Sequence, residues 1–488
     1  MSEEKAIDAD FSTPYKVEAY AEHLVDMTFK DVADLGICPP GVKRDYAKRG
    51  YKGGWGVFIE ERYFGYKANS DPEPDLEVAG VEIKSTCLDR RADGIEVAGE
   101  RLSLETINYN DDFPDLLFDS KLWHKCKLLL LIWYERVKGI EDPYQQVIRH
   151  VKLFTPPVSD IEVIEEDYRT ISTMIREGNA EQLSESLTNY LGAATTGSGH
   201  DKDLVKQTRY GNGKSAKRRR WSYKQQYMKY VLDTYILGAE EAESIVKDPS
   251  ELKNSTFEGR VKSLVYAHVG ETDETLCAEL GIPFDPDNKS QWYVLSYCML
   301  GIHGDRAAEF EKANINLRAV RVEYGFNKLK EATSLDTFEF RDLVATPWEV
   351  SKVRRMFEET KFLYVVFEKN ADERTSTLRG CFFWSMPTRD MLELERCYNA
   401  TRDCVKRGVI LESRGKRIYN NLPKKSDNRV AHVRPHANKA AYKLQDGTTI
   451  GDVEHDASEL PDGRAMTRQS FWLNNDYVLD FIKRGLEI

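Results

Sequence analysis

The sequence lacks a long apolar run, a secretion signal and a strong bias toward any one residue type. Its longest uninterrupted apolar run covers residues 128–134, far short of the roughly 20 residues that a membrane-spanning helix needs. The first residues are acidic and no apolar stretch follows them, so neither a signal peptide nor a transit peptide is expected. We therefore expect a cytoplasmic protein with no membrane partner.

Closely spaced cysteines are also missing. The eight cysteines are scattered, with no C-x-x-C pair and no histidine at the spacing of a zinc ligand. This argues against a zinc site and against a disulfide framework. We expect reduced thiols, packed as small apolar side chains, at Cys38, Cys87, Cys126, Cys277, Cys298, Cys381, Cys397 and Cys404.

An excess of positive charge is the third absence. The 488 residues include 70 Lys and Arg against 81 Asp and Glu, a formal net charge of −11, which argues against a protein that coats nucleic acid by bulk charge. Hydrophobic residues make up 41% of the chain, which is typical of a globular protein. At roughly 150 residues per domain, the length predicts two to three domains.

The chain contains an internal repeat. Residues 154–178 and 384–408 align without a gap at an offset of 230, and both predict a strand end, a proline turn, an amphipathic helix and a terminating glycine. Weaker matches in the same order join 127–131 to 361–365, 29–37 to 274–282, and 221–227 to 471–477. We predict two tandem α/β domains of one fold, each a central mixed sheet flanked by helices. Their expected ranges are 1–238 and 257–488, with a linker at 239–256.

One cluster of charged residues occurs in the first half only. Asp75 is followed by Gly80, and then by a strand pattern in which Glu82 and Lys84 share a face. Two converging carboxylates supply the oxygen ligands that Mg²⁺ prefers, and a nearby ammonium can orient water or neutralise charge on a phosphate. The bare pattern is common and also fits a solvated strand edge, so its context must decide.

The context is a glycine-rich segment ahead of an expected helix that carries Glu60, and Lys125 ahead of the buried strand. With these residues the chain resembles the MutH family of PD-(D/E)xK nucleases. The resemblance implies a catalytic centre formed by Glu60, Asp75, Glu82, Lys84 and Lys125. In it Asp75 and Glu82 would hold Mg²⁺, Lys84 would act on the water, Lys125 would support the scissile phosphate, and Glu60 would be an auxiliary carboxylate.

The resemblance extends along the chain and becomes more specific. Residues 182–191, 244–249, 432–436 and 469–477 resemble the GATC-cleaving type II restriction endonucleases built from two MutH-like halves. This implies Mg²⁺-dependent double-strand cuts at a short palindrome, GATC by resemblance. It also implies double-stranded DNA and a cognate DNA methyltransferase as partners, and a monomer that can dimerise on DNA.

The second half departs from the catalytic pattern. An offset of 234 places one residue opposite each member of the cluster, except that Tyr297 falls only roughly opposite Glu60; the other four, in chain order, are Glu309, Asn316, Arg318 and Glu359. A metal carboxylate becomes an amide, one lysine becomes an arginine that keeps its proton, and the other lysine becomes an acid. We expect a pseudo-nuclease that binds a second copy of the site as effector.

Two basic stretches offset the acidic net charge locally. Residues 202–229 hold ten Lys and Arg against one acid, and residues 402–439 hold eleven against three. We expect the first to begin as a glycine-flanked loop that stays disordered until DNA binds, followed by a strand or arm that enters a helix. The predicted DNA contacts are Arg218, Arg219, Arg220, Trp221, Tyr223 and Lys224, and, in the second half, His432, Arg434, Trp472 and Asn474.

Two other interpretations stay open at this point. One is a strand-nicking or modification-dependent endonuclease on the same scaffold, although the duplication argues against a simple nicking enzyme. The other is a non-catalytic DNA-binding protein that kept the fold. A Lys84→Ala substitution separates the second from an enzyme, because a protein without catalysis has no cleavage to lose.

Overall fold

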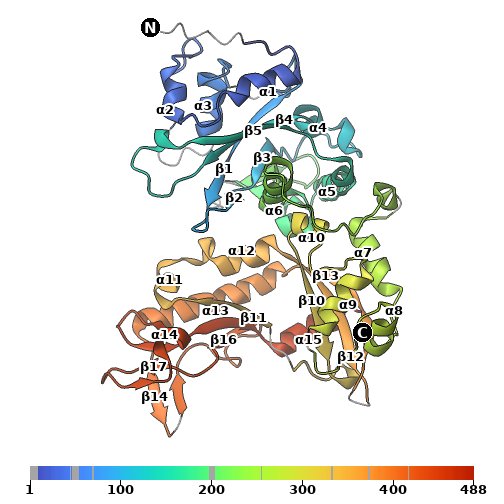
Figure 1. The fold of residues 1–488 in the computed structure, drawn as a ribbon, viewed down its shortest axis with the longest axis vertical. Coiled ribbons are helices and arrows are strands. Elements are labelled where there is room, and N and C mark those ends of the chain that lie inside the picture. The colour runs from blue at the N-terminus through green and yellow to red at the C-terminus, as the bar shows by residue number, and fades with distance from the viewer. Residues whose placement is uncertain are drawn as a thin grey trace. The chain divides into compact units, whose positions relative to one another are not determined.

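A computed structural model describes residues 9–43, 46, 54–68, 71–196, 204–253, 255–288, 290–330, 333–371, 374–415 and 417–488. The chain forms two compact units (Figure 1). Unit 1 comprises residues 1–257 and 306–314, and unit 2 comprises residues 258–305 and 315–488. The segment predicted as a linker, 239–256, thus lies within unit 1, together with a short segment from the second half of the sequence. Within the ranges given above, no helix is both long and apolar enough to span a membrane.

The central sheet of unit 1 has the strand order β2-β1-β4-β5, with β1 and β4 parallel and the other pairs antiparallel. Its strands are β1 (Glu82–Arg90), β2 (Glu96–Ala98), β4 (Leu129–Glu135) and β5 (Ile148–Phe154). The first five residues of β4 are all buried, as expected for a strand covered on both faces. Figure 1 shows α1 (Pro14–Glu22), α2 (Phe29–Asp34) and α3 (Gly54–Arg62) on one side of this sheet, and α5 (Val158–Arg176) and α6 (Gln225–Tyr230) on the other.

A second, antiparallel sheet of unit 1 has the order β3-β9-β6. It consists of β3 (Leu102–Thr106), β6 (Leu191–Thr195) and β9 (Arg219–Tyr223), and α4 (Lys121–Cys126) precedes β4. Between β6 and β9, strands β7 (Leu204–Gln207) and β8 (Lys214–Lys217) pair as a hairpin. The prediction of a disordered basic loop is therefore wrong for residues 204–217, because the buried Gln207 side chain donates to Glu181 and accepts from the Ala180 amide. Residues 202 and 203, the start of that predicted loop, lie outside the described residues.

Unit 2 repeats both strand orders. Its sheet β10-β12-β13 has a parallel pair followed by an antiparallel pair, like β1-β4-β5, and its sheet β11-β21-β16 is antiparallel, like β3-β9-β6. These strands are β10 (Ile315–Val322), β11 (Thr333–Phe338), β12 (Lys361–Lys369), β13 (Ser376–Trp384), β16 (Ala431–Pro435) and β21 (Gln469–Leu473). The mixed α/β architecture expected from the sequence is confirmed.

The other elements of unit 2 are helices on the sheets and short strands at its edge. The helices are α7 (Phe257–Tyr266), α8 (Asp273–Glu279), α9 (Gln291–Met299), α11 (Phe340–Ala345), α12 (Lys352–Glu359), α13 (Thr388–Arg407), α14 (Val453–Asp456) and α15 (Asn475–Gly485). The strands are β14 (Leu411–Arg414), β15 (Arg417–Asn420), β17 (Tyr442–Lys443), β18 (Thr449–Ile450), β19 (Ala457–Glu459) and β20 (Ala465–Thr467).

The strand ladders match positions in the two units without reference to sequence offset. In unit 1 the ladder row of Glu82 crosses β4 and reaches the last residue of β5. In unit 2 the row that reaches the last residue of β13 starts at Asn316. The rows two residues farther on match Lys84 with Arg318 in the same way. Both ladder rows agree with the matches made from the repeat.

Helix α10 (Ala308–Ala313) belongs to unit 1 although it comes directly before β10 in the sequence. The buried Glu309 carboxylate accepts hydrogen bonds from the amides of Ile245 (2.9 Å) and Val246 (3.0 Å) and from the hydroxyl of Ser244 (2.6 Å). The expectation that Glu309 stands opposite Asp75 in a second-half site is therefore wrong. Its carboxylate fastens residues 244–246 within unit 1 instead.

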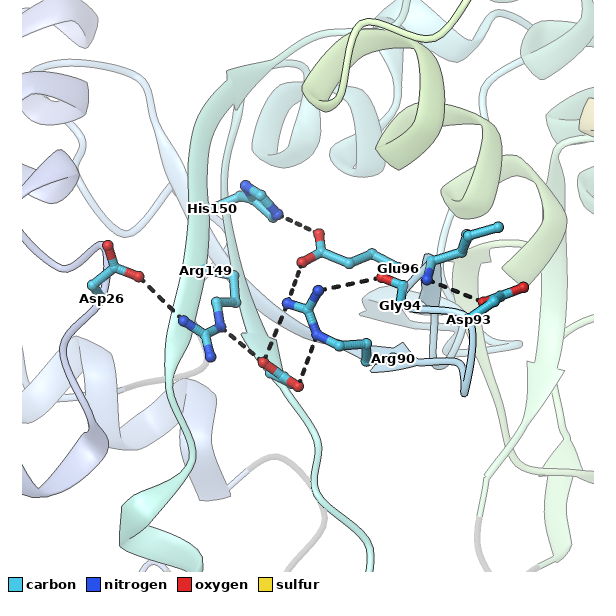
Figure 2. Close-up of polar contacts among 9 residues, drawn as sticks. Asp26, Arg90, Asp93, Gly94, Glu96, Arg149 and His150 are labelled. Atoms are coloured by element: carbon cyan, nitrogen blue, oxygen red, sulfur yellow. Dashed lines mark hydrogen bonds and ion pairs between the residues drawn. The ribbon is translucent and has the colours of Figure 1, made fainter.

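A salt-bridge network ties the strands of the central sheet at the opposite end of β1 from the predicted catalytic residues. Figure 2 shows Arg90 in this network and Arg149 directed toward Asp26. Arg90 also binds Glu96 at 2.7 Å, and the Glu135 carboxylate accepts from Arg90 at 3.1 Å and from Arg149 at 2.8 Å. Because these residues come from β1, β2, β4 and β5, the network links all four strands.

Candidate active site

A tight turn brings Asp75 and Glu82 together. Leu76 and Val81 pair across the turn through two main-chain hydrogen bonds, and Gly80 takes a positive φ of 66° that favours glycine. The Glu82 carboxylate accepts from the Asp75 amide at 3.1 Å, and the Asp75 carboxylate accepts from the Ile83 amide at 3.0 Å. The backbone thus holds both acidic side chains at the start of β1.

Two lysines converge on the Glu82 carboxylate. The Lys84 ammonium donates to Glu82 Oε1, and the Lys125 ammonium lies 3.9 Å from the same oxygen. Lys125 comes from α4 and also donates to the main-chain oxygen of Asp71 at 2.6 Å. Glu82 is 2% exposed, so a carboxylate buried this deeply is stable as an anion only beside positive charge.

Glu60 reaches the same cluster from helix α3. A side chain on Gly56 would come within 3.1 Å of the Ser85 hydroxyl, so glycine at this position lets α3 pack closely on β1. Burial raises the pKa of Glu60 to about 7, and the negative charges of Asp75 and Glu82 add to this rise while Lys84 opposes it. Lys52 and Gly53 of the predicted glycine-rich segment lie outside the described residues.

Burial and a neighbouring like charge both change the titration of Asp75. Burial raises the pKa of Asp75 to about 6, and the neighbouring Glu82 charge adds to the rise. For Lys84, burial is the largest single effect and acts to lower the pKa, but the charges of Glu82, Cys126 and Asp75 and the hydrogen bond to Glu82 together outweigh it, so the pKa lies above its ordinary value. The lysine therefore stays protonated. A further positive charge would stabilise the two converging carboxylates in their ionised form.

The donor set fits a hard divalent cation such as Mg²⁺. Asp75 and Glu82 present carboxylate oxygens from one turn, where they accept from two main-chain amides and from the Lys84 ammonium, and such oxygens are the ligands that Mg²⁺ prefers. The pKa of Asp75 is raised first by burial and then by the Glu82 charge, and a metal held there would offset both effects by favouring the ionised carboxylate. All five residues predicted as catalytic, Glu60, Asp75, Glu82, Lys84 and Lys125, thus belong to one electrostatic cluster.

The predicted DNA contacts of unit 1 divide into exposed and buried side chains. Arg218 and Arg220 are exposed. The buried ones are Arg219, Trp221, Tyr223 and Lys224. The Arg219 guanidinium donates to the carbonyls of Leu183 and Ala193, and the Lys224 ammonium donates to that of Thr188. These four side chains therefore pack within unit 1, and of the six predicted contacts only Arg218 and Arg220 have exposed side chains.

The predicted contacts of unit 2 form one cluster on β16 and β21. The Arg434 guanidinium lies 4.3 Å from the ring centre of Trp472, whose indole N–H donates to the Arg434 carbonyl at 3.2 Å. His432 Nδ1 lies 2.7 Å from Asn474 Oδ1. Because Asn474 Nδ2 donates to two carbonyls, its oxygen is the acceptor for His432. Asn474 is buried, so it positions His432, whereas Arg434 is exposed and His432 and Trp472 are partly exposed.

Comparison with known proteins places this cluster in a family. The family model described as DNA mismatch repair enzyme MutH matches residues 64–167. Type II restriction enzyme Sau3AI of Staphylococcus aureus is 32% identical over 451 residues, which cover 86% of this chain and 90% of that enzyme. The chain belongs to the Sau3AI family of type II restriction enzymes. The prediction of a MutH-like restriction nuclease is confirmed.

Members of the MutH group match a shorter part of this Sau3AI-family enzyme. The DNA mismatch repair protein MutH of Shigella boydii serotype 4 is 27% identical and that of Escherichia coli O157:H7 is 26% identical, each over 193 residues. These matches cover 39% of this chain and 79% of each MutH protein. The match to Sau3AI, in contrast, is long enough to include residues of both units.

Some residues of the site could not be found from the sequence of this Sau3AI-family enzyme. One is Asp71, whose main-chain oxygen accepts a hydrogen bond from Lys125. A main-chain carbonyl is present in every residue, so the sequence gives no signal for this contact. Glu105 of β3 is also part of the site's electrostatics, because burial raises its pKa while Lys125 and Lys121 oppose the rise. A lone glutamate on a predicted strand gave no reason to connect it with Lys125.

Proposed function

We propose that the protein is a Mg²⁺-dependent restriction endonuclease that makes double-strand cuts in DNA at a short palindrome, GATC by resemblance. The observation that carries the proposal is the cluster of the buried Glu82 with the partly buried Asp75 and Lys84, with Lys125 3.9 Å from Glu82. Two acids and two lysines at the start of a strand are the groups that phosphodiester hydrolysis requires.

Each side chain has a separate task in the proposed reaction. Asp75 and Glu82 would hold Mg²⁺, which supplies Lewis-acid polarisation of the phosphate oxygen and lowers the pKa of a bound water. The Lys84 ammonium, kept protonated by Glu82, orients the attacking water and offsets negative charge that develops on the phosphate. Lys125, which donates to the Asp71 carbonyl and lies 3.9 Å from Glu82 Oε1, would support the scissile phosphate.

Glu60 is suited to an auxiliary proton exchange. Its pKa of about 7 places it between the protonated and ionised forms near neutral pH, where a general acid or base is most effective. We assign it to proton transfer with water at the edge of the cluster. Its charge interacts with those of Asp75 and Glu82, the two acids that would bind the metal.

Unit 2 is proposed as a second DNA-binding domain of the same fold that has lost catalysis. The ladder rows give Asn316 and Arg318 in place of Glu82 and Lys84, and Glu309 lies in unit 1. An amide is a poor metal ligand and an arginine keeps its proton. The cluster of His432, Arg434 and Trp472 supports binding of a second site as effector.

The proposed stoichiometry follows from one catalytic cluster per chain. A double-strand break needs two strand cuts, so two monomers meet on DNA or one chain cuts twice. The proposed location is the cytoplasm, where the DNA substrate would be found. A cognate DNA methyltransferase is then required as the functional partner that protects host sites from cleavage.

Digestion of plasmid DNA tests the proposal directly. Purified protein with Mg²⁺ should linearise and then fragment a plasmid, and sequencing of the ends should place every cut at one short palindrome. Plasmids with one and with two sites should differ in rate if unit 2 acts as effector, because a tethered second site raises the local concentration. Equal rates that are first order in enzyme would remove the effector role and leave the nuclease.

A modification-dependent or nicking enzyme on the same scaffold is the second candidate. Parallel digests of methylated and unmethylated plasmid separate it from a conventional restriction enzyme. Cleavage only of methylated DNA, or an open-circular product that is never linearised, would favour this candidate.

A further inference from the structure

Unit 2 carries a basic hairpin that has no counterpart in the equivalent connection of unit 1, residues 179–190, all of which the structure describes. Strands β14 and β15 pair antiparallel, with Arg414 opposite Arg417 across the turn. Gly415 in the turn has a φ of 62°, which a two-residue hairpin turn needs and glycine adopts readily. Figure 1 shows β14 at the periphery of unit 2.

The two faces of the hairpin differ. Side chains alternate along a strand, so Leu411 and Ile418 share one face, and both pack against the hydrophobic core of unit 2. The opposite face carries Glu412 and Tyr419 together with the two arginines. Its side chains, Glu412, Arg414, Arg417 and Tyr419, are all exposed. The hairpin is thus anchored on one side and presents charge on the other.

The exposed face is ordered by contacts among its own side chains. The Arg414 guanidinium lies 5.2 Å from the ring centre of Tyr419 and 2.6 Å from a Glu412 carboxylate oxygen. Stacking on tyrosine holds a guanidinium flat while its N–H donors stay available to a phosphate. Glu412 competes for the same donors, so its carboxylate should weaken binding of an anion.

The equivalent connection in unit 1 has the opposite charge. Helices α5 and α13 are matched by the repeat, and β6 and β16 are matched by the ladders, so residues 179–190 correspond to residues 409–430. The unit 1 connection has two acids and no Lys or Arg, whereas the unit 2 connection is ten residues longer and has six Lys and Arg against two acids. Glu185 of the shorter connection is paired with Arg101.

The hairpin continues directly into the predicted recognition strand β16. The Val433 amide donates to the Pro423 carbonyl at 2.9 Å, and the Asn428 side chain accepts from the amides of Val430 and Ala431. Lys424 and Lys425, in the same connection, are exposed. The basic face is therefore joined by the backbone to the strand that carries His432 and Arg434.

We propose that the Arg414, Arg417 and Tyr419 face binds the phosphates of double-stranded DNA that flank the site held by β16. The inference rests on the proposed function, since it needs unit 2 to bind DNA. A two-stranded ribbon fits the major groove, and guanidinium groups bind phosphates in a bidentate way. Phosphate contacts add affinity without reading sequence, so the hairpin strengthens unit 2 on any flanking sequence.

The test is the salt dependence of DNA binding by the full-length chain, measured by fluorescence anisotropy with Ca²⁺ in place of Mg²⁺. Arg414→Gln combined with Arg417→Gln should make the negative slope of log K against log salt shallower by about 2, because each phosphate contact contributes about 0.9 to its magnitude. At 0.15 M salt, affinity should fall about tenfold, equally for duplexes with and without GATC. Arg414→Lys with Arg417→Lys should keep most of the slope.

Two controls make the result specific. Lys262→Gln with Arg374→Gln removes the same charge from exposed positions of unit 2 near β13 and should leave the slope within about 0.5 of the wild type. Glu412→Gln should tighten binding two- to fivefold, which no loss of folding can produce.

The outcomes separate the inference from the proposed function. An unchanged slope in the double glutamine variant, or an equal change in the Lys262 and Arg374 control, overturns the inference while wild-type binding and cleavage stand. Loss confined to the GATC duplex overturns it as well, since it would assign the hairpin to base reading. If the wild-type chain binds neither duplex, the proposed function itself fails.

Discussion

The strand pairs β1–β4 and β10–β12 have the same parallel geometry and opposite chemistry. The first places Glu82 and Lys84 at the start of β1, and the second places Asn316 and Arg318 in the same ladder rows. The segment before the strand differs as well, because the turn with Asp75 stays beside β1 whereas α10 with Glu309 is part of unit 1. Unit 2 therefore differs from unit 1 at two levels, the residue types in these rows and the backbone segment that precedes the strand.

A buried Asp–Tyr pair gives a second comparison. The hydroxyl of Tyr227 donates to Asp160 at 3.0 Å, and the hydroxyl of Tyr477 donates to Asp390 at 3.0 Å. The repeat predicted both matches, but the positive partners differ. In unit 1 it is Lys312 of α10, which is 4% exposed, and in unit 2 it is Arg429, which is 54% exposed. The same Asp–Tyr pair thus binds α10 in unit 1 and the connection before β16 in unit 2.

Removal of the lysine at the first site should have the largest effect. Lys84→Ala should lower the cleavage rate at least about 10³-fold, because a group that stabilises the transition state is worth roughly 10²–10⁴. Affinity for the DNA site should change less than about threefold. Single-turnover cleavage and anisotropy measure the two quantities. Arg318→Ala is the matched variant in unit 2, and an equal loss of cleavage there would break the comparison.

Removing the cation that binds each Asp–Tyr pair should destabilise the protein by different amounts. Lys312→Met leaves Asp160 buried without its ion pair, which costs about 3 kcal/mol, whereas Arg429→Met should cost about 1 kcal/mol or less because that side chain is largely solvated. Thermal unfolding measures both. The double variant Lys312→Met with Asp160→Asn should recover part of the loss, and additive losses would contradict a direct coupling.

The salt-bridge network of Figure 2 predicts a pH effect on unit 1. Hydrogen bonding from Arg90 lowers the pKa of Glu135, with Arg149 adding to the effect while burial opposes it. Since the folded pKa lies below the unfolded value, the stabilisation is present above about pH 4.5 and is lost as the pH falls through the folded pKa. Glu135→Gln should therefore flatten the decline of thermal stability between about pH 5 and pH 3.

The matched position in unit 2 sharpens that measurement. Glu368 lies 2.6 Å from Arg379, as Glu135 lies 2.8 Å from Arg149, and the repeat matches the two arginines. Glu368→Gln is the control for loss of an equivalent ion pair elsewhere in the chain. If Glu135→Gln leaves the decline of thermal stability at low pH unchanged, this network does not cause the pH dependence.

The smallest expected effect comes from restoring residue types in unit 2. Asn316→Glu and Arg318→Lys, introduced into the Lys84→Ala chain, should recover no cleavage above about 10⁻³ of the wild-type rate. The reason is that Glu309 stays in unit 1 and that acids, Glu358 and Glu359, end helix α12. Recovered cleavage in a plasmid assay would mean that residue type alone distinguishes the two units.

The sequence was sufficient for the catalytic cluster because its spacing is local. A glycine between Asp75 and Glu82 and a period-two strand after it predict convergence within ten residues, and the turn has that form. The DNA contacts were less predictable, because a charged run does not report burial. Arg219 and Lys224 look like surface cations in sequence, yet carbonyl groups distant in the chain bind them inside unit 1.

The sequence by itself determined the repeat, the mixed α/β class and the acid and lysine set, since each is written in residue types at short, regular spacing. Only the tertiary structure decided which unit α10 completes, because Lys312 and Glu309 find their partners more than 60 residues away. It also decided that 204–217 folds as a hairpin and that β14–β15 displays one charged face. Burial and long-range pairing depend on the whole packed chain, which no local pattern encodes.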